Sequence, residues 1–322
     1  MKPFRVSFLV NPISGGGRGR ELYDLLSEVM LSFGFGDDEW SAELTERENG
    51  ELQIARLAQQ SDRLIAVGGD GTMNALLSEL VLHPDEGITV GLIPLGTGND
   101  LARVLGIYQN YASKGLPNTL RKLVMSHSHL FDVWRLSDKR MMAAYCSVGL
   151  DAKIAEQWNA DRSSGRIPFR SDLLKKGWYL PIFAKTRSDR LPKGCRLRWV
   201  TPGGAIRQTD LAGHCSAIIS NIPSYAGGAH PFGSSSYSDG QIEILFLPTL
   251  FRFALAMTVT RSPLLARWFK GLLKTEAARE VDLFVPQGVS VQVDGEGRSE
   301  ELSGDWLRIR HAGQLRLLAL KS

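Results

Sequence analysis

The residues most able to do chemistry lie in three glycine-containing turns within the first hundred positions. These turns are Asn-Pro-Ile-Ser-Gly-Gly-Gly at residues 11–17, Gly-Gly-Asp-Gly-Thr at 68–72 and Pro-Leu-Gly-Thr-Gly-Asn-Asp at 94–100. Glycine lets backbone N–H groups come close to an anion, and a helix N-terminus behind such a turn favours negative charge. The three turns together therefore predict a cradle for phosphate groups.

The polar side chains in these turns indicate which chemistry the cradle would support. Asp70 sits in a tight glycine setting, where a carboxylate can reach magnesium on bound phosphates or the hydroxyl that attacks them. Thr97 and Asn99 offer side-chain donors in the third turn. Each turn alone is also explained by ordinary loop geometry. The turns match neither the P-loop nor the Gly-x-Gly-x-x-Gly pattern, which argues against those two nucleotide-binding classes.

The elements that must position these turns follow from the hydrophobic pattern. In the first 110 residues, short apolar runs alternate with helical patterns, which predicts β-α units around a parallel sheet. We expect strands at 4–10, 40–44, 63–67 and 88–93, and helices at 18–31, 51–60, 73–81 and 100–105. Loops after parallel strands share one edge of the sheet, so the three turns should converge there.

The pattern changes near residue 130. Apolar and polar residues then alternate with period two, as in 131–136 and 241–247, and turns rich in Gly, Pro and Ser separate the runs. This pattern is typical of antiparallel β-structure. A second, all-β domain is therefore expected after residue 130.

Composition limits the class of protein. The chain has 322 residues, 43% of them hydrophobic, with 38 Lys+Arg against 34 Asp+Glu. These values fit two ordinary folded domains and exclude a disordered or fibrous chain. Three widely spaced cysteines without a Cys-x-x-Cys pair favour a reducing compartment. No apolar run approaches the ~20 residues of a spanning helix, so we expect a cytoplasmic protein.

Two segments combine basic and aromatic residues. Residues 161–200 contain eleven basic and three acidic residues around the aromatic run at 178–183. Such a segment fits contact with an anionic membrane surface, although charge alone favours a solvated basic face. A second segment has apolar residues at helical spacing and fits a lipid-facing element: Leu264, Leu265, Trp268, Phe269 and Leu272. The alternative explanation of this stripe is a helix of the protein core.

The turns at 68–72 and 96–100 resemble the signature of the diacylglycerol kinase-type catalytic domain. That superfamily includes bacterial soluble lipid kinases, sphingosine and ceramide kinases and, more distantly, NAD kinases. Further matches follow in the family's order at Asn11-Pro12, Phe131-Asp132, Ser220-Asn221, Ala226-Gly227-Gly228, Ser238-Asp239-Gly240 and Val293-Asp294-Gly295-Glu296. The matches cover nearly the whole chain, but residues 155–210 carry none.

The resemblance implies a fold and a set of nucleotide contacts. The expected fold class is α/β plus all-β. An α/β nucleotide-binding domain resembling that of phosphofructokinases and NAD kinases would cover residues 1–130 and about 305–322. An antiparallel β-sandwich would cover residues 131–304, with the active site in the cleft between the domains. By the same resemblance, ATP would contact Asn11, Ser14, Thr45, Gly69, Asp70, Gly71, Thr72 and Thr97.

The resemblance also implies two catalytic carboxylates, Asp70 and Glu296. We assign Glu296 as general base and Asp70 as the residue that organises magnesium-ATP. In the sphingosine-kinase branch the aspartate of the glycine motif is a proposed base, so the reverse assignment stays open. From the residues alone, both Glu296 and Asp239 are ordinary hairpin-turn acids. The family further implies a structural metal site at Asp239 with the carbonyls of Ser236 and Gln241.

The expected function is an ATP-dependent lipid kinase of lipid metabolism that transfers the γ-phosphate to a lipid hydroxyl with Mg²⁺ as cofactor. A kinase of a soluble substrate, resembling NAD kinase, is the alternative, but no recognition motif for a second nucleotide is found. A non-catalytic nucleotide-binding membrane module is the third hypothesis. Expected partners are ATP, a lipid and an anionic membrane surface, without nucleic acid, and a homodimer is left open. The expected location is cytoplasmic with peripheral membrane association.

Overall fold

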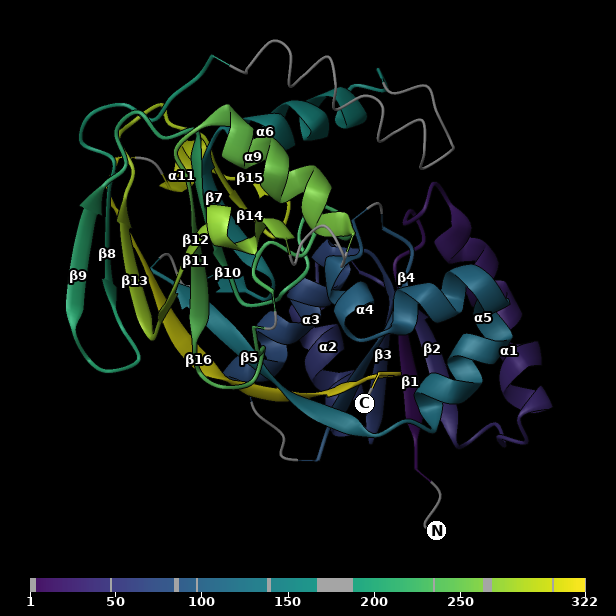
Figure 1. Cartoon of the computed structure of the whole chain (residues 1–322). Helices are drawn as coiled ribbons and strands as arrows, with labels where there is room; N and C mark the ends of the chain where they lie inside the picture. The colour runs from purple at the N-terminus through teal and green to yellow at the C-terminus, as the bar shows by residue number, and fades with distance from the viewer. Residues whose placement is uncertain are drawn as a thin grey trace. The chain divides into compact units, whose positions relative to one another are not determined.

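The computed structural model describes residues 4–46, 48–83, 87–96, 98–137, 140–166, 188–233, 235–262, 268–302 and 304–321 (Figure 1). The chain divides into two compact units. Unit 1 consists of Met1–Val133 and Gly313–Ser322, and unit 2 of Trp134–Ala312.

Unit 1 is built on a parallel sheet. Its strands are β1 (Val6–Val10), β2 (Trp40–Leu44), β3 (Arg63–Gly68) and β4 (Thr89–Pro94), in the order β2-β1-β3-β4. Nearly every residue of β1, β3 and β4 is buried, as expected for parallel strands covered on both faces. Val10 is paired with Val67, and Gly68 with Pro94, so the carboxyl ends of β1, β3 and β4 align.

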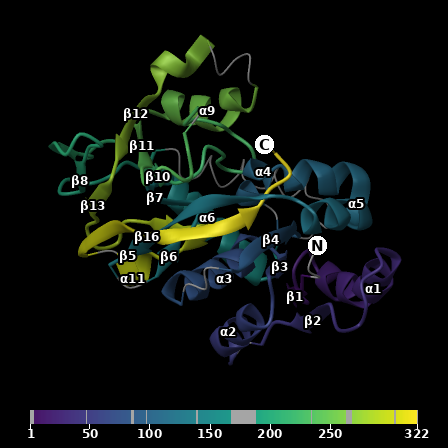
Figure 2. The ribbon, with the colours of Figure 1, turned by 90° about the horizontal axis from the view of Figure 1, so that it is seen from below.

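Helices cover both faces of this sheet. They are α1 (Arg18–Ser32), α2 (Gly50–Gln59), α3 (Asp70–Leu82), α4 (Asp100–Val104) and α5 (Ile107–Val124). Figure 2 shows α2 and α3 on one side of the strands and α5 on the other. The chain moves in one direction from β1 to β2 and in the other from β2 to β4, so right-handed crossovers place the helices on opposite faces. The α/β prediction for this part of the chain is confirmed.

Unit 2 is a sandwich of two sheets. The first has the strand order β16-β13-β8-β9 and the second the order β12-β11-β10-β7-β14-β15. The first is formed by β8 (Arg196–Val200), β9 (Ile206–Asp210), β13 (Glu280–Phe284) and part of β16 (Trp306–Leu318). The second is formed by β7 (Tyr145–Gly149), β10 (Ser216–Ser220), β11 (Ile242–Leu247), β12 (Lys274–Ala278), β14 (Val291–Val293) and β15 (Glu296–Gly297).

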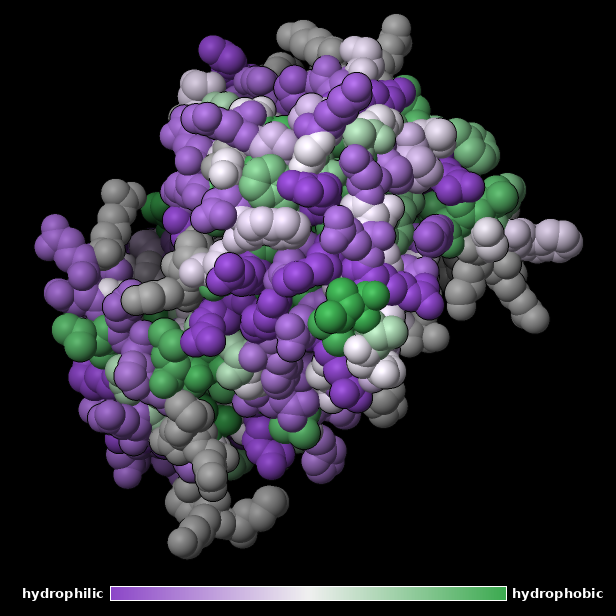
Figure 3. Space-filling view, turned by 90° about the vertical axis from the view of Figure 1, so that its left-hand side faces the viewer, coloured by the Kyte–Doolittle hydropathy of each residue, from purple (hydrophilic) through white to green (hydrophobic). Residues whose placement is uncertain are grey.

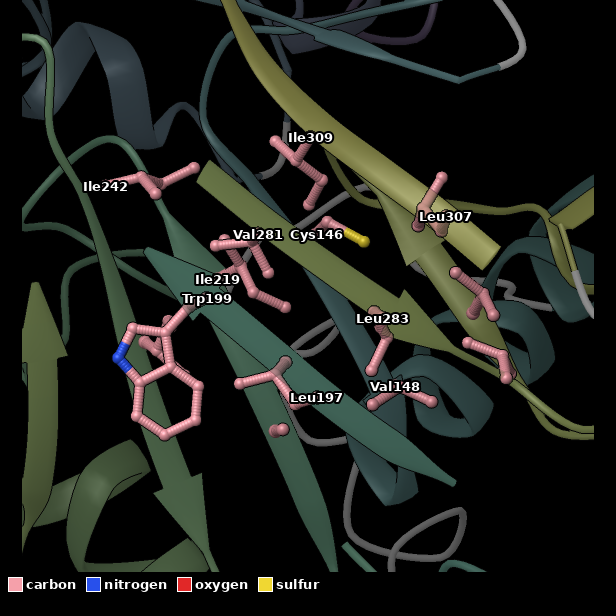
Figure 4. Packing of buried hydrophobic residues seen from close by; sticks show 14 of the residues in the cluster. Cys146, Val148, Leu197, Trp199, Ile219, Ile242, Val281, Leu283, Leu307 and Ile309 are labelled. Atoms are coloured by element: carbon pink, nitrogen blue, oxygen red, sulfur yellow. The ribbon is translucent and has the colours of Figure 1, made fainter. Parts of the chain in front are cut away.

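The inner faces of these two sheets form one hydrophobic core. Figure 4 shows Leu197 and Leu283 of the first sheet pointing toward the side chains of the second, which include Val148 and Ile219. Strand β8 alternates exposed and buried residues, which is the pattern of a strand with one solvated face. The prediction of an antiparallel β-sandwich is confirmed.

Several helices accompany the sandwich. They are α6 (Leu150–Ser163), α9 (Leu250–Thr258) and the four-residue α11 (Ser299–Leu302). Two single 3₁₀ turns lie at Val259–Arg261 and Lys270–Leu272. The period-two pattern predicted an all-β region here, so helix α6 was not predicted from the sequence.

Two long strands contribute residues to both units. In β16, residues 306–310 pair antiparallel with β13, whereas Arg316 and Leu317 pair parallel with Thr89 and Val90 of β4. Strand β5 (Ser128–Leu136) likewise begins in unit 1, and its last residues pair with β6 (Met141–Met142) in unit 2. The C-terminal strand therefore belongs in part to the sandwich and in part to the parallel sheet.

The surface around β9 is solvated. Four of the five residues of β9 are exposed, and Figure 3, which views the side where β9 lies, shows mostly hydrophilic residues. Among the described residues, no helix has the length and apolar character needed to cross a bilayer. The aromatic run at 178–183 and the stripe residues Leu264 and Leu265 lie outside the described residues.

The sharp turn from β7 into α6 gives a test of the fold. Gly149 has φ +92°, and a Cβ there would lie 2.4 Å from the carbonyl oxygen of Cys215. We expect Gly149→Ala to lower the free energy of unfolding by about 2 kcal/mol or more in urea titrations. Gly203→Ala is the matched control, because nothing lies within 4 Å of a Cβ there, and it should change stability by less than about 0.5 kcal/mol. Equal effects would contradict the steric explanation.

Candidate functional site

The three glycine turns meet at the carboxyl edge of the unit 1 sheet. The Nδ2 of Asn11, after β1, donates to Oγ1 of Thr72, which lies at the start of α3, at 3.1 Å. The N–H of Leu95, after β4, donates to the carbonyl of Gly68 at 2.7 Å. These contacts confirm that side chains and backbone of all three turns lie together.

The second and third turns approach each other through glycine backbones. A Cβ on Gly69 would lie 3.2 Å from Cα of Gly96, and a Cβ on Gly96 would lie 2.9 Å from Cα of Gly69. A Cβ at Gly96 would clash with the backbone of Gly69, and a Cβ at Gly69 would crowd the backbone of Gly96, which would have to shift by a few tenths of an ångström. Glycine is therefore required here by close approach, and the approach leaves backbone rather than side chains at this edge.

Asp70 and Asn99 connect these turns. Asp70 is the first residue of α3, and its Oδ2 accepts the N–H of Asn99 at 3.0 Å. Asn99 is buried in a left-handed conformation with φ 52°, and its Nδ2 donates to the Gly96 carbonyl at 2.6 Å. Its Oδ1 is buried and has no hydrogen-bond partner among the residues that the structure describes. This arrangement aims a carboxylate and an amide oxygen into the same region of the third turn.

The other predicted nucleotide contacts lie in or near the same turns. Ser14 is partly buried between α1 and the first turn, where its carbonyl accepts the N–H of Gly19 at 3.1 Å. The N–H of Thr45 donates to the carbonyl of Val10, so Thr45 follows β2 beside the first turn. Gly71 is exposed in the first turn of α3. Thr97 lies outside the described residues.

The oxygens of this edge fit magnesium that arrives with a nucleotide. Magnesium prefers oxygen ligands and is usually bound by one or two carboxylates together with substrate phosphates. Asp70 supplies a carboxylate, and the buried Oδ1 of Asn99 is an acceptor without a donor. Among the described residues, no three His, Cys, Asp or Glu side chains converge into an all-protein metal cage. The residues present therefore fit a metal shared with phosphate.

The structure adds a positive charge that the sequence analysis did not single out. Arg103, in α4, donates through Nε to the Gly98 carbonyl at 3.2 Å, and its guanidinium lies 3.6 Å from the centre of the Tyr108 ring. A cation-π contact of this kind fixes the direction of the arginine. Arg103 thus holds a cation beside the third turn, in a place that anionic phosphates would favour.

Glu296 belongs to unit 2, where it opens β15 after a tight turn from β14. Its side chain is half exposed, and its carboxylate pairs with Arg298. The backbone of the turn is held on both sides: the Gly295 N–H donates to Oε1 of Gln292, and the Gly295 carbonyl accepts Nδ2 of Asn159, each at 2.8 Å. Glu296 thus presents a half-exposed carboxylate on a turn whose backbone is hydrogen-bonded on both sides.

Asp294, in the same turn, is a buried anchor. Its carboxylate accepts three backbone N–H groups at 2.8–2.9 Å, from Ala143, Ala144 and Tyr145. Burial raises the pKa of Asp294 to about 6, aided by the charge of Glu296, although the three N–H donors act in the opposite direction. Asp294, two residues before Glu296, therefore anchors the turn to the backbone of residues 143–145.

The predicted structural metal site lies in the loop before β11. Oδ1 of Asp239 accepts the Gln241 N–H at 3.1 Å, and Oδ2 faces Nε2 of Gln241 at 3.4 Å. Ser236 lies in the same loop, where its hydroxyl accepts the Ser238 N–H at 3.2 Å. Glu243 has a buried Oε2 without a hydrogen-bond partner, and burial and the charge of Asp239 raise the pKa of Glu243 to about 8. Neighbouring carboxylates with an unpaired buried oxygen fit a hard cation.

The buried Asp294 should make stability depend on pH. Its pKa is about 6 in the folded protein against an ordinary value of 3.8, so the folded state holds the proton more tightly. The stability it contributes is fully present below about pH 4 and is lost as pH rises through about 6, on the order of 3 kcal/mol.

Asp294→Asn removes the titrating group. We expect the free energy of unfolding of the wild type, minus that of the variant, to fall between about pH 4.5 and about pH 7 in urea titrations. A difference that grows with pH would mean that the three N–H bonds outweigh burial.

Comparisons with known proteins place the chain in a family. The model of the diacylglycerol kinase catalytic domain matches residues 5–136, and that of the diacylglycerol kinase accessory domain matches residues 141–297. The eye-specific diacylglycerol kinase of Drosophila melanogaster is 30% identical over 329 residues, which cover 90% of this chain and 21% of that protein. Diacylglycerol kinase iota of Rattus norvegicus is 27% identical over 331 residues, 92% of this chain and 29% of that protein. The chain thus spans about a fifth to a third of the length of these curated relatives.

Solved structures show the same fold. A crystal structure described as a diacylglycerol kinase from Bacillus anthracis aligns with a TM-score of 0.66 at 19% identity, covering 100% of this chain and 99% of that one. Another, of a putative diacylglycerol kinase from the same organism, has a TM-score of 0.68 at 19% identity and covers 100% and 98%. With both domain models matched in order and the two-unit fold shared, the chain belongs to the diacylglycerol kinase-type family.

Proposed function

We propose that this protein is an ATP-dependent lipid kinase that transfers the γ-phosphate of ATP to a lipid hydroxyl. The observation that supports it most is the glycine-backbone edge of unit 1, with Asp70 inside it, in a chain that carries both diacylglycerol kinase domains. The names of the relatives favour a diacylglycerol-like acceptor.

In this proposal, unit 1 binds the nucleotide. Backbone N–H groups of the turns and the N-terminus of α3 face the phosphates, and the close approach of Gly69 and Gly96 holds the second and third turns together there. Arg103 compensates phosphate charge beside the third turn. Asn11, Ser14, Thr45, Thr72 and Thr97 complete the proposed ATP contacts. Positioning and charge neutralisation supply most of the catalysis of phosphoryl transfer.

Asp70 and Glu296 have different roles in this proposal, magnesium binding and proton removal. Magnesium, when bound with ATP, neutralises charge that develops on the phosphates. Asp70 and the Asn99 amide oxygen would hold it. Glu296 takes the proton of the acceptor hydroxyl, for which its exposed carboxylate on a held turn is suited. We also propose a structural cation at Asp239, with Ser236 and Gln241 as further ligands.

We further propose a peripheral contact with anionic membrane. Three large apolar side chains are exposed in the part of unit 2 around α9 and the 3₁₀ turn at Lys270–Leu272: Phe251 at 64%, Trp268 at 85% and Leu272 at 42%. Lys274 follows them at the start of β12. Exposed aromatic and basic residues of this kind support reversible contact with a lipid surface.

A lipid panel tests the function directly. The protein is incubated with labelled ATP, magnesium and vesicles that contain diacylglycerol, monoacylglycerol, phosphatidylglycerol, a sphingoid base or undecaprenol. We expect organic-soluble labelled product from one of them, and Asp70→Asn should lower kcat at least ~100-fold with unchanged folding. Aqueous product would indicate a soluble-substrate kinase, and wild-type rates in the variant would remove Asp70 from the site.

Glu296→Gln separates the two carboxylate roles. A base contacts the acceptor, so kcat should fall at least ~100-fold while the Kd of ATP, measured by calorimetry, changes less than ~2-fold. Glu300→Gln, an exposed acid four residues away, is the control and should leave kcat unchanged. Loss of ATP affinity in Glu296→Gln would instead make Glu296 a nucleotide or metal ligand.

A further inference from the structure

A buried glutamine, Gln292, forms a hydrogen bond with the backbone of the turn that carries Glu296. Gln292 is 1% exposed and lies in β14 directly opposite Ser147 of β7. Its Oε1 accepts the N–H of Gly295, the residue before Glu296, at 2.8 Å. An N–H group can be satisfied only by an acceptor, so this contact fixes which end of the amide faces the turn.

The other end of the amide faces a carboxylate. Nε2 of Gln292 donates to the Ser147 hydroxyl at 2.9 Å and toward Oδ2 of Asp151 at 3.4 Å. Asp151 lies in the first turn of α6, and its Oδ2 also accepts the hydroxyls of Ser147 and Tyr225. The side chains of Ser147, Tyr225 and Gln292 thus all donate toward one oxygen of Asp151.

The hydrogen bonds from Gly295 through Gln292 to Asp151 all run from donor to acceptor in the same direction. The Asp151 carboxylate accepts, the Gln292 amide donates to it, and the far oxygen of that amide accepts from Gly295. An acid in the first turn of a helix is explained by the helix dipole alone. That explanation does not account for a buried amide between Asp151 and the turn. A chain of hydrogen bonds in low dielectric strengthens each member when all are satisfied.

We propose that Asp151 and Gln292 are positioning residues that orient the Gly295 backbone and thereby hold Glu296 toward the acceptor hydroxyl. The proposal rests on the proposed function only for the role of Glu296. Neither residue touches the reacting atoms, and both act through the turn.

The test replaces the Nε2 donor of Gln292 by a carboxyl oxygen, which changes the shape of the side chain very little. In Gln292→Glu, one carboxyl oxygen still accepts the Gly295 N–H while the new carboxyl is protonated, and repulsion by Asp151 displaces the side chain from this N–H when the carboxyl is ionised. The other oxygen donates to Asp151 when protonated and repels Asp151 when ionised. Other titratable groups around the cluster are the Tyr225 hydroxyl and the carboxyls of Asp294 and Glu156. Only the new carboxyl distinguishes this variant from the wild type.

We expect kcat of Gln292→Glu to lie at least ~10-fold below wild type near pH 8 and within ~3-fold of it near pH 6, with the KM for ATP within ~2-fold at both. Gln157→Glu is the matched control. Gln157 is an exposed residue of α6 that donates to the Asp161 carboxylate at 3.0 Å, and among the described residues no hydrogen bond joins it to the turn. It should follow the wild-type pH profile.

A double variant and a direct measurement keep the proposal testable if folding suffers. Asp151→Asn combined with Gln292→Glu places an amide opposite the new carboxylate, so kcat near pH 8 should recover at least ~5-fold over Gln292→Glu alone. Hydrogen exchange of the Gly295 amide should show lost protection in Gln292→Glu near pH 8 and restored protection in the double variant.

Three results would overturn the proposal: a wild-type pH profile in folded Gln292→Glu, the same pH-dependent loss in Gln157→Glu, or unchanged protection of Gly295. If the wild type phosphorylates no lipid, the proposed function fails, and exchange at Gly295 still decides whether Asp151 and Gln292 hold the turn.

Discussion

Contact between two glycine backbones is the constraint on which the nucleotide end of this protein depends. The parallel register places Gly68 beside Pro94, so the turns that follow β3 and β4 leave the sheet side by side. Gly69 and Gly96 then approach so closely that a Cβ on either would collide with the other. The two turns therefore pack together beside the N-terminus of α3, which is the surface that we propose for phosphate binding.

The same edge shows how the fold supplies charge without a P-loop lysine. Arg103 comes from α4, which follows the third turn, and its direction is set by the Gly98 carbonyl and the Tyr108 ring. Asp70 comes from α3 and is oriented by the N–H of Asn99. Positive and negative groups are thus fixed by different helices around one stretch of bare backbone. This separation keeps the carboxylate and the guanidinium each bound to the turn by its own hydrogen bond.

In unit 2, the carboxylate of Glu296, which we propose as the general base, is half exposed, whereas the side chains of Asp294 and Gln292, which hold its turn, are buried. A buried polar group costs free energy unless it is hydrogen-bonded, and here Asp294 accepts three backbone N–H groups and Gln292 uses both ends of its amide. Asn159 of α6 binds the remaining carbonyl of Gly295. The polar groups beneath Glu296 therefore satisfy one another, and the turn has little freedom left.

The sequence alone determined the elements of unit 1 closely, because β1, β3 and β4 are nearly continuous apolar runs that are each followed by a glycine-containing turn, and apolar residues alternate in β2. The strands expected at 40–44 and 63–67 are found at Trp40–Leu44 and Arg63–Gly68. Helix α5 was not predicted; it contains Pro117 and kinks at Gly115, where the backbone leaves the helical conformation. The ATP contacts in these turns were named from the resemblance to the diacylglycerol kinase-type catalytic domain, because each turn alone is also explained by ordinary loop geometry.

Only the tertiary structure decided which residues support the site. Asp151, Gln292 and Asn159 come from α6 and β14, and no local spacing links them, because their meeting depends on the pairing of β14 with β7 and on α6 packing beside it. Arg103 likewise becomes relevant only once α4 places it on the third turn. Hydrophobic periodicity and motif order are local properties of the chain, whereas a buried polar network is defined by partners far apart in sequence. For that reason Asp70 and Glu296 could be proposed as catalytic carboxylates from a resemblance in motif order, and the residues that hold their turns could not.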